Sequence, residues 1–307
     1  HYMDAHPDMV KSRNMICSTL NPLLENGIIP VITGFLAATE NGNITTLGRG
    51  GSDYSAAIIG AALPADEVWI YTDVDGVMTA DPRLIPDAAT VPVCSYREIS
   101  ELAYYGAKVL HPKAIRPVIE EGIGLRVCNT FNPGHPGTRL VSELEAKNGI
   151  IKAITTVRGL QLITLEGRGM LGVPGVAART FDAVAKLGTS VPLITQASSE
   201  QSICFAVPVN STNQVIETLT SAFSHEIESR DIDSVWATEE VGIVTVVGEG
   251  MRSTPGVSGR IFTALGSNDV NVIAIAQGSS EVSISLVVKA SHIQQALRVL
   301  HDLIQPM

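Results

Sequence analysis

Residues 67–83 read Glu-Val-Trp-Ile-Tyr-Thr-Asp-Val-Asp-Gly-Val-Met-Thr-Ala-Asp-Pro-Arg, and this stretch decides the fold class of the first half of the chain. Its apolar start predicts a strand that ends at Thr72, and the Asp-Gly and Asp-Pro pairs predict a loop after it. In open α/β sheets, ligands bind where loops leave the carboxyl ends of strands. The loop is therefore a candidate binding site, although ordinary turn chemistry would also explain its residues.

Short apolar runs alternate with helical patterns on either side of this strand. Residues 52–63 are rich in alanine and isoleucine, which predicts a buried helix stopped by Pro64. The remaining expected elements are helices over 97–105 and 112–122 and strands over 27–35, 44–47 and 124–128, with a hairpin turn at Asn41-Gly42. This alternation predicts an α/β layer with a mainly parallel sheet.

The second half of the chain contains an internal repeat. Residues 161–208 recur at a constant offset of 81, so that Gly167, Gly169, Met170 and Gly175 return as Gly248, Gly250, Met251 and Gly256. Each copy reads strand, glycine turn, helix, strand, turn, strand, helix, which predicts a small α/β sandwich. Two copies indicate a duplicated domain, because a solenoid needs at least three.

A second candidate site is Gly48-Arg49-Gly50-Gly51-Ser52-Asp53, which precedes the expected helix. Glycines let the backbone approach a ligand closely, and the free N–H groups of a helix start favour an anion. Arg49 could clamp a carboxylate or phosphate, and Asp53 supplies a fixed charge. The alternative is a tight turn capped by Ser52, and spacing alone does not decide between the two.

A third glycine pattern, Gly167-Arg168-Gly169-Met170-Leu171-Gly172, matches the dinucleotide-binding fingerprint. That fold needs an acidic residue at the end of the second strand, roughly 20 residues on, and this strand ends in Gln196. In the second copy Ser253 replaces the third glycine. We therefore interpret the match as accidental. A nicotinamide-dependent dehydrogenase is the least supported of the candidate functions. The sequence contains no GxxxxGK[ST] phosphate loop.

The composition narrows the classes of partner. Thirty-one acidic residues against 21 basic ones give a net charge of −10, which argues against nucleic acid or an anionic membrane as a partner. The four cysteines lie far apart without CxxC spacing, so neither a metal site nor a disulfide framework is indicated. A cytoplasmic protein is the expectation.

Taken together, Gly-Arg-Gly-Gly-Ser-Asp at 48–53, residues 72–83 and Gly-Ala-Lys-Val-Leu-His-Pro at 106–112 resemble the aspartate kinase family in order and spacing, and the repeats resemble its tandem ACT domains. The resemblance implies a partial, mainly parallel α/β/α sandwich of the amino-acid-kinase type followed by two ferredoxin-like (βαββαβ) ACT domains. The implied boundaries are 1–148, 149–228 and 229–307. The family phosphorylates the side-chain carboxylate of L-aspartate with ATP and Mg²⁺, the first step toward lysine, threonine and methionine.

The resemblance also implies roles for individual residues. Phe35, Arg49 and Ser52 would hold aspartate, and Asp53 would be the catalytic carboxylate that organises the reacting groups. The nucleotide would be lined by Thr72, Asp73, Met78, Arg83 and Lys108. Met78 stands where the family often has tyrosine.

Family members begin with a Lys-Phe-Gly-Gly-Thr-Ser strand, and this motif is not in the sequence. Its lysine stabilises the transferring phosphoryl group, a large contribution to catalysis. We therefore expect that these 307 residues alone are inactive. The main alternative function is a non-catalytic, amino-acid-binding regulatory subunit.

The stretches around Gln196 and Gln277 are similar to those of the threonine-sensitive branch of the family. This nominates Gln196 and Gln277, with Ile194 and Ile275 beside them, as the effector site. Threonine is the favoured effector and lysine the rival. ACT domains commonly pair side by side, so the resemblance implies a homodimer or larger assembly.

Overall fold

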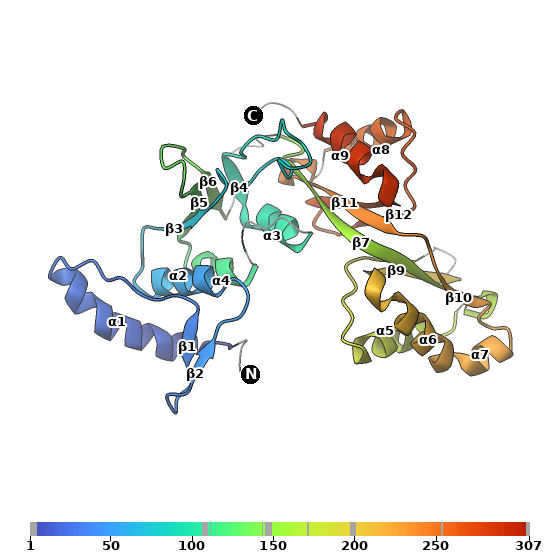
Figure 1. The fold of residues 1–307 in the computed structure, drawn as a ribbon, viewed down its shortest axis with the longest axis horizontal. Coiled ribbons are helices and arrows are strands. Elements are labelled where there is room, and N and C mark those ends of the chain that lie inside the picture. Colours follow the sequence, from blue (N-terminus) through green and yellow to red (C-terminus); the bar gives the residue numbers. More distant parts are fainter. Residues whose placement is uncertain are drawn as a thin grey trace. The chain divides into compact units, whose positions relative to one another are not determined.

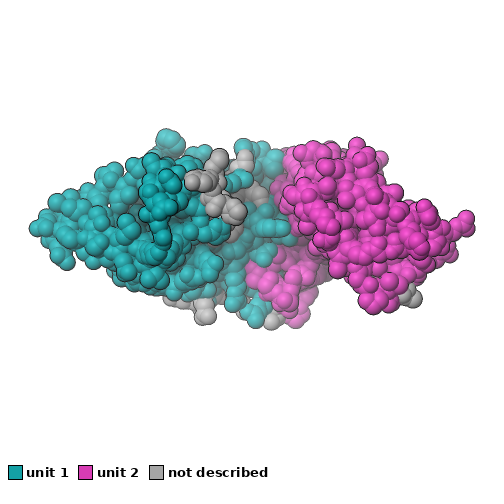
Figure 2. Space-filling view, turned by 90° about the horizontal axis from the view of Figure 1, so that it is seen from below, with its two compact units in different colours: residues 1–153, 247–252, 304–307 teal, residues 154–246, 253–303 magenta. Residues whose placement is uncertain are grey.

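The computed structural model describes residues 5–105, 110, 112–142, 144, 149–170, 172–196, 201–252 and 254–304. The chain divides into two compact units, residues 1–153 with 247–252 and 304–307, and residues 154–246 with 253–303 (Figure 2). The turn at 247–252 thus belongs to the first unit, although its sequence is part of the second repeat. The expected boundaries after residues 148 and 228 remain predictions.

The first unit contains a mixed sheet with strand order β3-β5-β6-β4. β3 pairs with β5 and β4 with β6 in parallel, whereas β5 and β6 are antiparallel, which agrees with the expected mainly parallel sheet. Figure 1 shows α2 and α4 together beside β3 and β5. The elements of this unit are α1 (Met9–Glu25), β1 (Leu36–Ala38), β2 (Ile44–Thr46), α2 (Gly51–Ala62), β3 (Glu67–Thr72), β4 (Val93–Ser95), α3 (Tyr96–Tyr104), α4 (Pro112–Glu120), β5 (Gly124–Asn129) and β6 (Thr138–Val141).

The local signals place most of these elements. α2 ends at Ala62, two residues before Pro64, as the proline predicts. β1 and β2 form a hairpin around Asn41-Gly42, as predicted. Helix α3 begins with a capping box, in which Ser95 Oγ accepts a hydrogen bond from Glu98 N and the Glu98 carboxylate accepts one from Ser95 N.

The strand predicted over residues 27–35 is wrong. Residues 28–34 form no strand, and Ile29 and Val31 are 87% and 98% exposed. An apolar run becomes a strand only when a neighbouring strand satisfies its backbone groups. Within the described part of the chain, no strand pairs with this segment.

The second unit is built around a sheet with strand order β12-β13-β11-β7-β9-β8, and β10 also pairs with β7. Helices α5 and α6 pack together, as do α8 and α9 (Figure 1). The elements are β7 (Ala153–Glu166), α5 (Val176–Lys186), β8 (Ile194–Gln196), β9 (Ser202–Pro208), α6 (Thr212–Ala222), α7 (Ser224–Glu228), β10 (Ser234–Ala237), β11 (Val241–Val247), α8 (Val257–Gly266), β12 (Ala274–Gln277), β13 (Ser283–Lys289) and α9 (Ile293–His301), with short 3₁₀ turns η1 (Arg168–Met170), η2 (Val209–Ser211), η3 (Glu249–Met251) and η4 (Ala290–His292).

The two repeats share strand β7 within one sheet. The second half of β7 pairs with β10, the strand that leads into the second repeat. The first half of β7 leads into the first repeat and lies beside β11, where Thr156 Oγ1 donates to Ile243 O at 2.9 Å. The first repeat is therefore complete in chain order as β7-α5-β8-β9-α6-β10, whereas the second repeat takes its last strand from the first half of β7.

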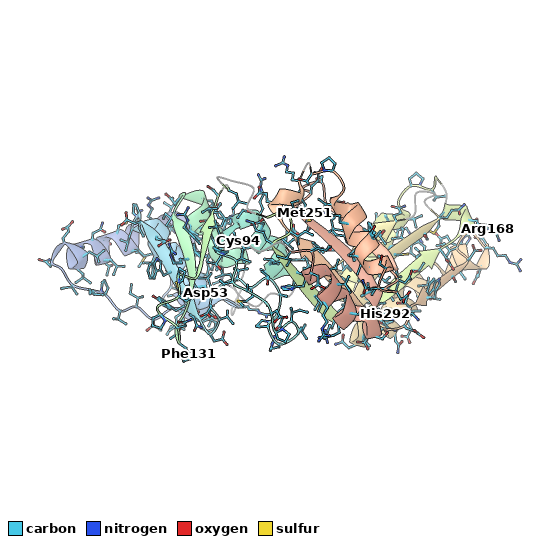
Figure 3. All side chains as sticks on the ribbon, turned by 90° about the horizontal axis from the view of Figure 1, so that it is seen from above. Asp53, Cys94, Phe131, Arg168, Met251 and His292 are labelled. Carbon is cyan, nitrogen blue, oxygen red and sulfur yellow. The ribbon has the colours of Figure 1, made fainter. Side chains whose placement is uncertain are left out.

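Close packing against the chain just before β10 and β7 explains the glycine pattern near the start of each repeat. A Cβ added at Gly167 would lie 2.3 Å from Asp231 O, and one at Gly248 would lie 2.3 Å from Ile150 O. Real side chains do not pack this closely against backbone, so only glycine fits. The space beside Gly167 is filled by protein, which agrees with rejecting it as a dinucleotide loop. Arg168, labelled in Figure 3, points into solvent.

A buried ion pair anchors the turn η3 within the first unit. Lys152 Nζ lies 3.0 Å from Glu98 Oε2, with side chains 1% and 0% exposed. Lys152 also donates to Val93 O at 3.1 Å, and the other oxygen of Glu98 accepts from Glu249 N at 2.7 Å. Glu98 thus caps its own helix, neutralises a buried lysine and holds the η3 backbone.

Candidate active site

The start of helix α2 is shaped to receive an anion. Gly48 and Gly50 have φ values of 77° and 71°, the left-handed region that favours glycine. Gly50 precedes the first residue of α2, and no side chain caps the helix by a hydrogen bond. The first N–H groups of such a helix, together with the positive end of its dipole, favour a negatively charged ligand. Ordinary capping by Ser52, the alternative explanation, is not observed.

Phe35 packs against this helix start in a strained backbone conformation. Its φ is 72°, which is an outlier for a bulky residue. Phe35 N donates to Ser55 Oγ at 3.0 Å, and Leu47 N donates to Phe35 O at 2.9 Å. A Cβ on Gly51 would lie 2.8 Å from the Phe35 ring. The ring is nevertheless 44% exposed, so one side remains available to a ligand.

The polar candidates of the same motif follow directly. Ser52 and Arg49 are exposed, and Asp53 is half-buried. Ser52 Oγ donates to Asp53 Oδ1 at 3.5 Å, a long hydrogen bond. The structure therefore gathers Phe35, Ser52 and Asp53 at one end of α2, with Arg49 on the turn that leads into it.

Chain geometry brings this helix start to the carboxyl edge of the sheet. Only residues 63–66 separate α2 from β3, and the two elements pack together, so the chain reverses between them. Twelve helical residues span about 18 Å and six strand residues about 20 Å, so the ends match. Asp53 and Thr72 consequently lie toward the same edge. The labels of Figure 3 place Asp53 on the ribbon of this unit.

The loop after β3 carries the proposed nucleotide residues. Thr72 Oγ1 donates to Asp73 Oδ1 at 3.2 Å, and Asp73 is exposed. Arg83 binds Asp81 through two hydrogen bonds, Nε to Oδ1 at 3.0 Å and Nη2 to Oδ2 at 2.7 Å. Bonding to Asp81 raises the pKa of Arg83. The arginine is thus held in a fixed direction, with its side chain 75% exposed.

Met78 lies on the part of the loop that doubles back. It forms an isolated antiparallel bridge with Thr90, whose hydroxyl lies 3.6 Å from the Met78 sulfur. The side chain is half-buried. Its thioether could line a pocket for an aromatic base but offers no ring to stack on one.

Sequence reasoning missed a carboxylate–amide cluster at the same edge. Asp75 Oδ1 accepts hydrogen bonds from Asn129 Nδ2 at 2.8 Å and Asn132 Nδ2 at 3.1 Å. The bond from Asn129 is the largest cause of the lowered pKa of Asp75. Turn chemistry alone accounts for Asp75 in the sequence, and its amide partners lie 54 and 57 residues away, where no local signal links them.

The exposed ring of Phe131 follows this cluster. Its side chain is 82% exposed, and Figure 3 shows it at the rim of the unit. Phe131 N donates to Asn129 Oδ1 at 2.8 Å, so the turn that carries it is fixed. Thr130 N also donates to Thr72 O at 2.9 Å, which ties the ends of β5 and β3 together.

Part of the expected site lies outside the described residues. This holds for Lys108 with most of its motif, and for residues 197–200 of the first repeat. The effector candidates are described: Ile194 and Gln196 lie on β8, and Ile275 and Gln277 on β12. β8 and β12 approach each other, and Ile194 and Ile275 are 49% and 44% exposed.

Two features are absent from the described residues. No group of three or more histidine, cysteine, aspartate or glutamate side chains there could hold a metal ion. No helix within the described ranges is long and apolar enough to cross a membrane.

Comparison with protein families matches two models. The amino acid kinase family model matches residues 7–129, and the ACT domain model matches residues 163–223 and 244–303. The first match contains the start of α2 and the loop after β3, and the second covers both repeats.

Known proteins with similar sequences and structures agree with these matches. A bifunctional aspartokinase/homoserine dehydrogenase of Haemophilus influenzae is 42% identical over 274 residues, which cover 89% of this chain and 34% of that protein. The crystal structure of the aspartate kinase of Clostridium acetobutylicum superposes with a TM-score of 0.84 at 29% identity, covering 94% of this chain and 66% of that one. E. coli aspartokinase III, solved with aspartate and ADP, gives 0.76 at 29% identity, covering 99% of this chain and 66% of that one.

These matches cover most of this chain but only part of each relative. It spans about a third of the length of the curated relatives that it matches first. Across the solved enzymes the match runs through the kinase segment and the repeats alike. The chain therefore joins a segment of the amino acid kinase family to two ACT domains, and it is homologous to the aspartate kinases.

Proposed function

We propose that the intact protein is an aspartate kinase, which transfers the γ-phosphoryl group of ATP to the side-chain carboxylate of L-aspartate. The observation that carries the proposal is the packing of α2 on β3, which places the uncapped helix start toward the edge of the sheet from which the loop after β3 leaves. In this reaction a carboxylate oxygen bonds to the γ-phosphorus while the bond to the bridging oxygen of ADP breaks. The nucleophile is already ionised, so no general base is needed. Catalysis then depends on positioning and on neutralising charge.

The residues at the helix start have the chemistry to bind aspartate. Arg49 is exposed and offers a planar fork for a carboxylate, beside the N–H groups of α2. Ser52 can donate a hydroxyl hydrogen bond, and the Phe35 ring closes one side. Asp53, half-buried next to Ser52, would organise the reacting groups.

The loop after β3 would bind the nucleotide through Thr72, Asp73, Met78 and Arg83, with Lys108 on the phosphates. E. coli aspartokinase III was solved with aspartate and ADP, which supports both ligand classes. Mg²⁺ would arrive with ATP, since it is usually held by phosphates and one or two carboxylates. Asp53 and Asp73 would be the candidate carboxylates for this Mg²⁺.

We further propose that an amino acid regulates the enzyme through the repeats. Gln196 and Gln277 hold equivalent positions on β8 and β12, and an amide can both donate to and accept from an effector. The nearby exposed Ile194 and Ile275 suit an apolar side-chain contact. Threonine is the favoured effector and lysine the alternative; E. coli aspartokinase III was solved with lysine and aspartate. A homodimer formed through the ACT domains and a cytoplasmic location remain predictions.

The proposal is tested by aspartate-dependent release of ADP from ATP by the intact protein. Arg49→Ala should raise the KM for aspartate at least tenfold, because a charged hydrogen-bond pair contributes about 1.5–3 kcal/mol. Arg116 supplies the matched control: it is exposed in the same unit and pairs with Glu120, four residues along its own helix, at 2.7 Å. Arg116→Ala should leave the KM unchanged.

The alternative, a non-catalytic regulatory subunit, predicts a different outcome. The protein would then bind threonine or lysine by calorimetry but release no ADP in the presence of aspartate. Equal effects of Arg49→Ala and Arg116→Ala would contradict the aspartate-binding role of the helix start.

A further inference from the structure

The buried hydroxyl of Thr138 holds the loop after β3 at its centre. Val77 N donates to Thr138 Oγ1 at 2.8 Å, and Thr138 Oγ1 donates to Val91 O at 2.7 Å. Thr138 is 0% exposed. A hydroxyl can accept one hydrogen bond and donate another at the same time, which a methyl group cannot. Thr138 therefore joins the outgoing and returning arms of the loop.

The backbone around Val77 depends on this contact. Val91 N donates to Val77 O at 2.7 Å, so Val77 is bonded on both sides. Gly76 has a φ of 125°, and a Cβ there would lie 2.9 Å from Thr138 N. The loop therefore packs directly against Thr138, the first residue of β6. Met78 is the next residue after Val77, so its backbone position depends on the same contact.

Asp75 provides a second anchor on the opposite side of Gly76. Its carboxylate holds the amides of Asn129 and Asn132, which follow β5. β3 and β5 are parallel with Thr72 paired to Asn129, so their ends are level. The two anchors hold the loop between the ends of β5 and β6.

We propose that Thr138 and Asp75 are positioning residues for the nucleotide: they fix the backbone of residues 75–77 so that the flanking Asp73, Met78 and Arg83 face one ligand. The inference rests on the proposed nucleotide role of this loop. Neither residue is assigned a contact with ATP. Their hydrogen bonds join the loop to the ends of β5 and β6 and do not involve α2, so we expect the larger effect on the nucleotide.

The test compares two substitutions of Thr138 in the intact protein. Thr138→Val keeps the shape but removes the hydroxyl, which leaves Val77 N–H and Val91 C=O unsatisfied; Thr138→Ser keeps the hydroxyl. Thr138→Val should raise the KM for ATP about tenfold or more, with a smaller change in kcat and in the KM for aspartate. Thr138→Ser should stay within about threefold of wild type. Asp75→Ala should act in the same direction as Thr138→Val, more weakly.

A matched control separates positioning from general loss of stability. Thr180, on α5 in the other unit, is also 0% exposed, and its hydroxyl donates to Val176 O at 2.9 Å. Thr180→Val should leave the KM for ATP unchanged. An unchanged KM for ATP in Thr138→Val, or an equal rise in Thr138→Ser, would overturn the inference.

Calorimetric titration with ATP distinguishes failure of this inference from failure of the proposed function. If wild type binds ATP but does not phosphorylate aspartate, the proposed function is wrong, and the ratio of ATP affinities between wild type and Thr138→Val still decides the inference. If wild type binds no ATP, both are overturned.

Discussion

Replacing Lys152 by methionine should destabilise the first unit more than any comparable change of a surface lysine. The Lys152 ammonium lies 3.0 Å from the Glu98 carboxylate, and both side chains are almost completely buried. Methionine retains most of the volume but leaves the carboxylate in the interior without its cation. Removing one partner of a buried pair costs about 3–5 kcal/mol. For a unit of this size, 1 kcal/mol corresponds to roughly 2–4 °C in Tm, so the transition should fall by roughly 6–20 °C.

Differential scanning calorimetry of the intact protein measures this effect. Lys289 is the matched control, because it pairs with Glu239 at 3.3 Å with side chains 56% and 84% exposed. Exposed pairs contribute about 0–1 kcal/mol, so Lys289→Met should shift Tm by less than about 4 °C. The double variant Lys152→Met, Glu98→Gln should recover part of the loss by removing the isolated charge. A decrease for Lys152→Met no larger than for Lys289→Met would refute the reasoning.

Three further predictions follow from packing and charge. Gly248→Ala should lower Tm strongly, because the added Cβ would collide with the backbone at residues 150–151. Gly259→Ala, in open space on α8, should not lower Tm, and equal shifts in Tm for the two variants would contradict this prediction. Burial raises the pKa of Cys94 well above its usual value, so iodoacetamide at pH 8 should modify this thiol only after unfolding. Mass spectrometry measures the modification, and rapid labelling of Cys94 in the folded protein would contradict the prediction. The hydrogen bond from Arg179 lowers the pKa of Glu226, so that pair stabilises the folded state at neutral pH and loses its effect as the pH falls through the folded pKa. The Tm difference between wild type and Arg179→Met should therefore shrink below about pH 4, and a difference that grows there would show the sign to be wrong.

The parts of the fold predicted correctly are those encoded locally. β3, α2 and β5 follow from short apolar runs, a proline and turn residues within a few positions of each other. The segment 27–35 carries the same apolar signal but forms no strand, since strand formation depends on a partner that local sequence does not specify.

The repeats illustrate the same limit at longer range. The constant offset reveals that two similar units exist, but it does not say that the second unit takes a strand from the segment before the first. That arrangement becomes visible only when Gly167 and Gly248 are seen packed against backbone far away in sequence. The glycine pattern was therefore detected correctly, and its cause lies in packing rather than in cofactor binding.

The candidate site was predictable where its residues share one stretch of chain. The composition of a short stretch of sequence is enough to identify the glycine turn before α2 and the loop after β3. The positioning roles of Asp75 and Thr138 cannot be identified in this way, because their hydrogen-bond partners lie 54 and 61 residues away. A threonine at the start of a strand is also common. Sequence patterns identify groups that could touch a ligand more readily than groups that hold them in place.

The most direct test of the proposed function is to trap the product. The intact protein would be incubated with ATP, Mg²⁺, L-aspartate and hydroxylamine, which converts an acyl phosphate into a hydroxamate and releases phosphate. An aspartate kinase should form aspartyl hydroxamate in an amount equal to the ADP released, and threonine should reduce the rate. A folded protein that binds ATP but forms no hydroxamate would contradict the proposed function.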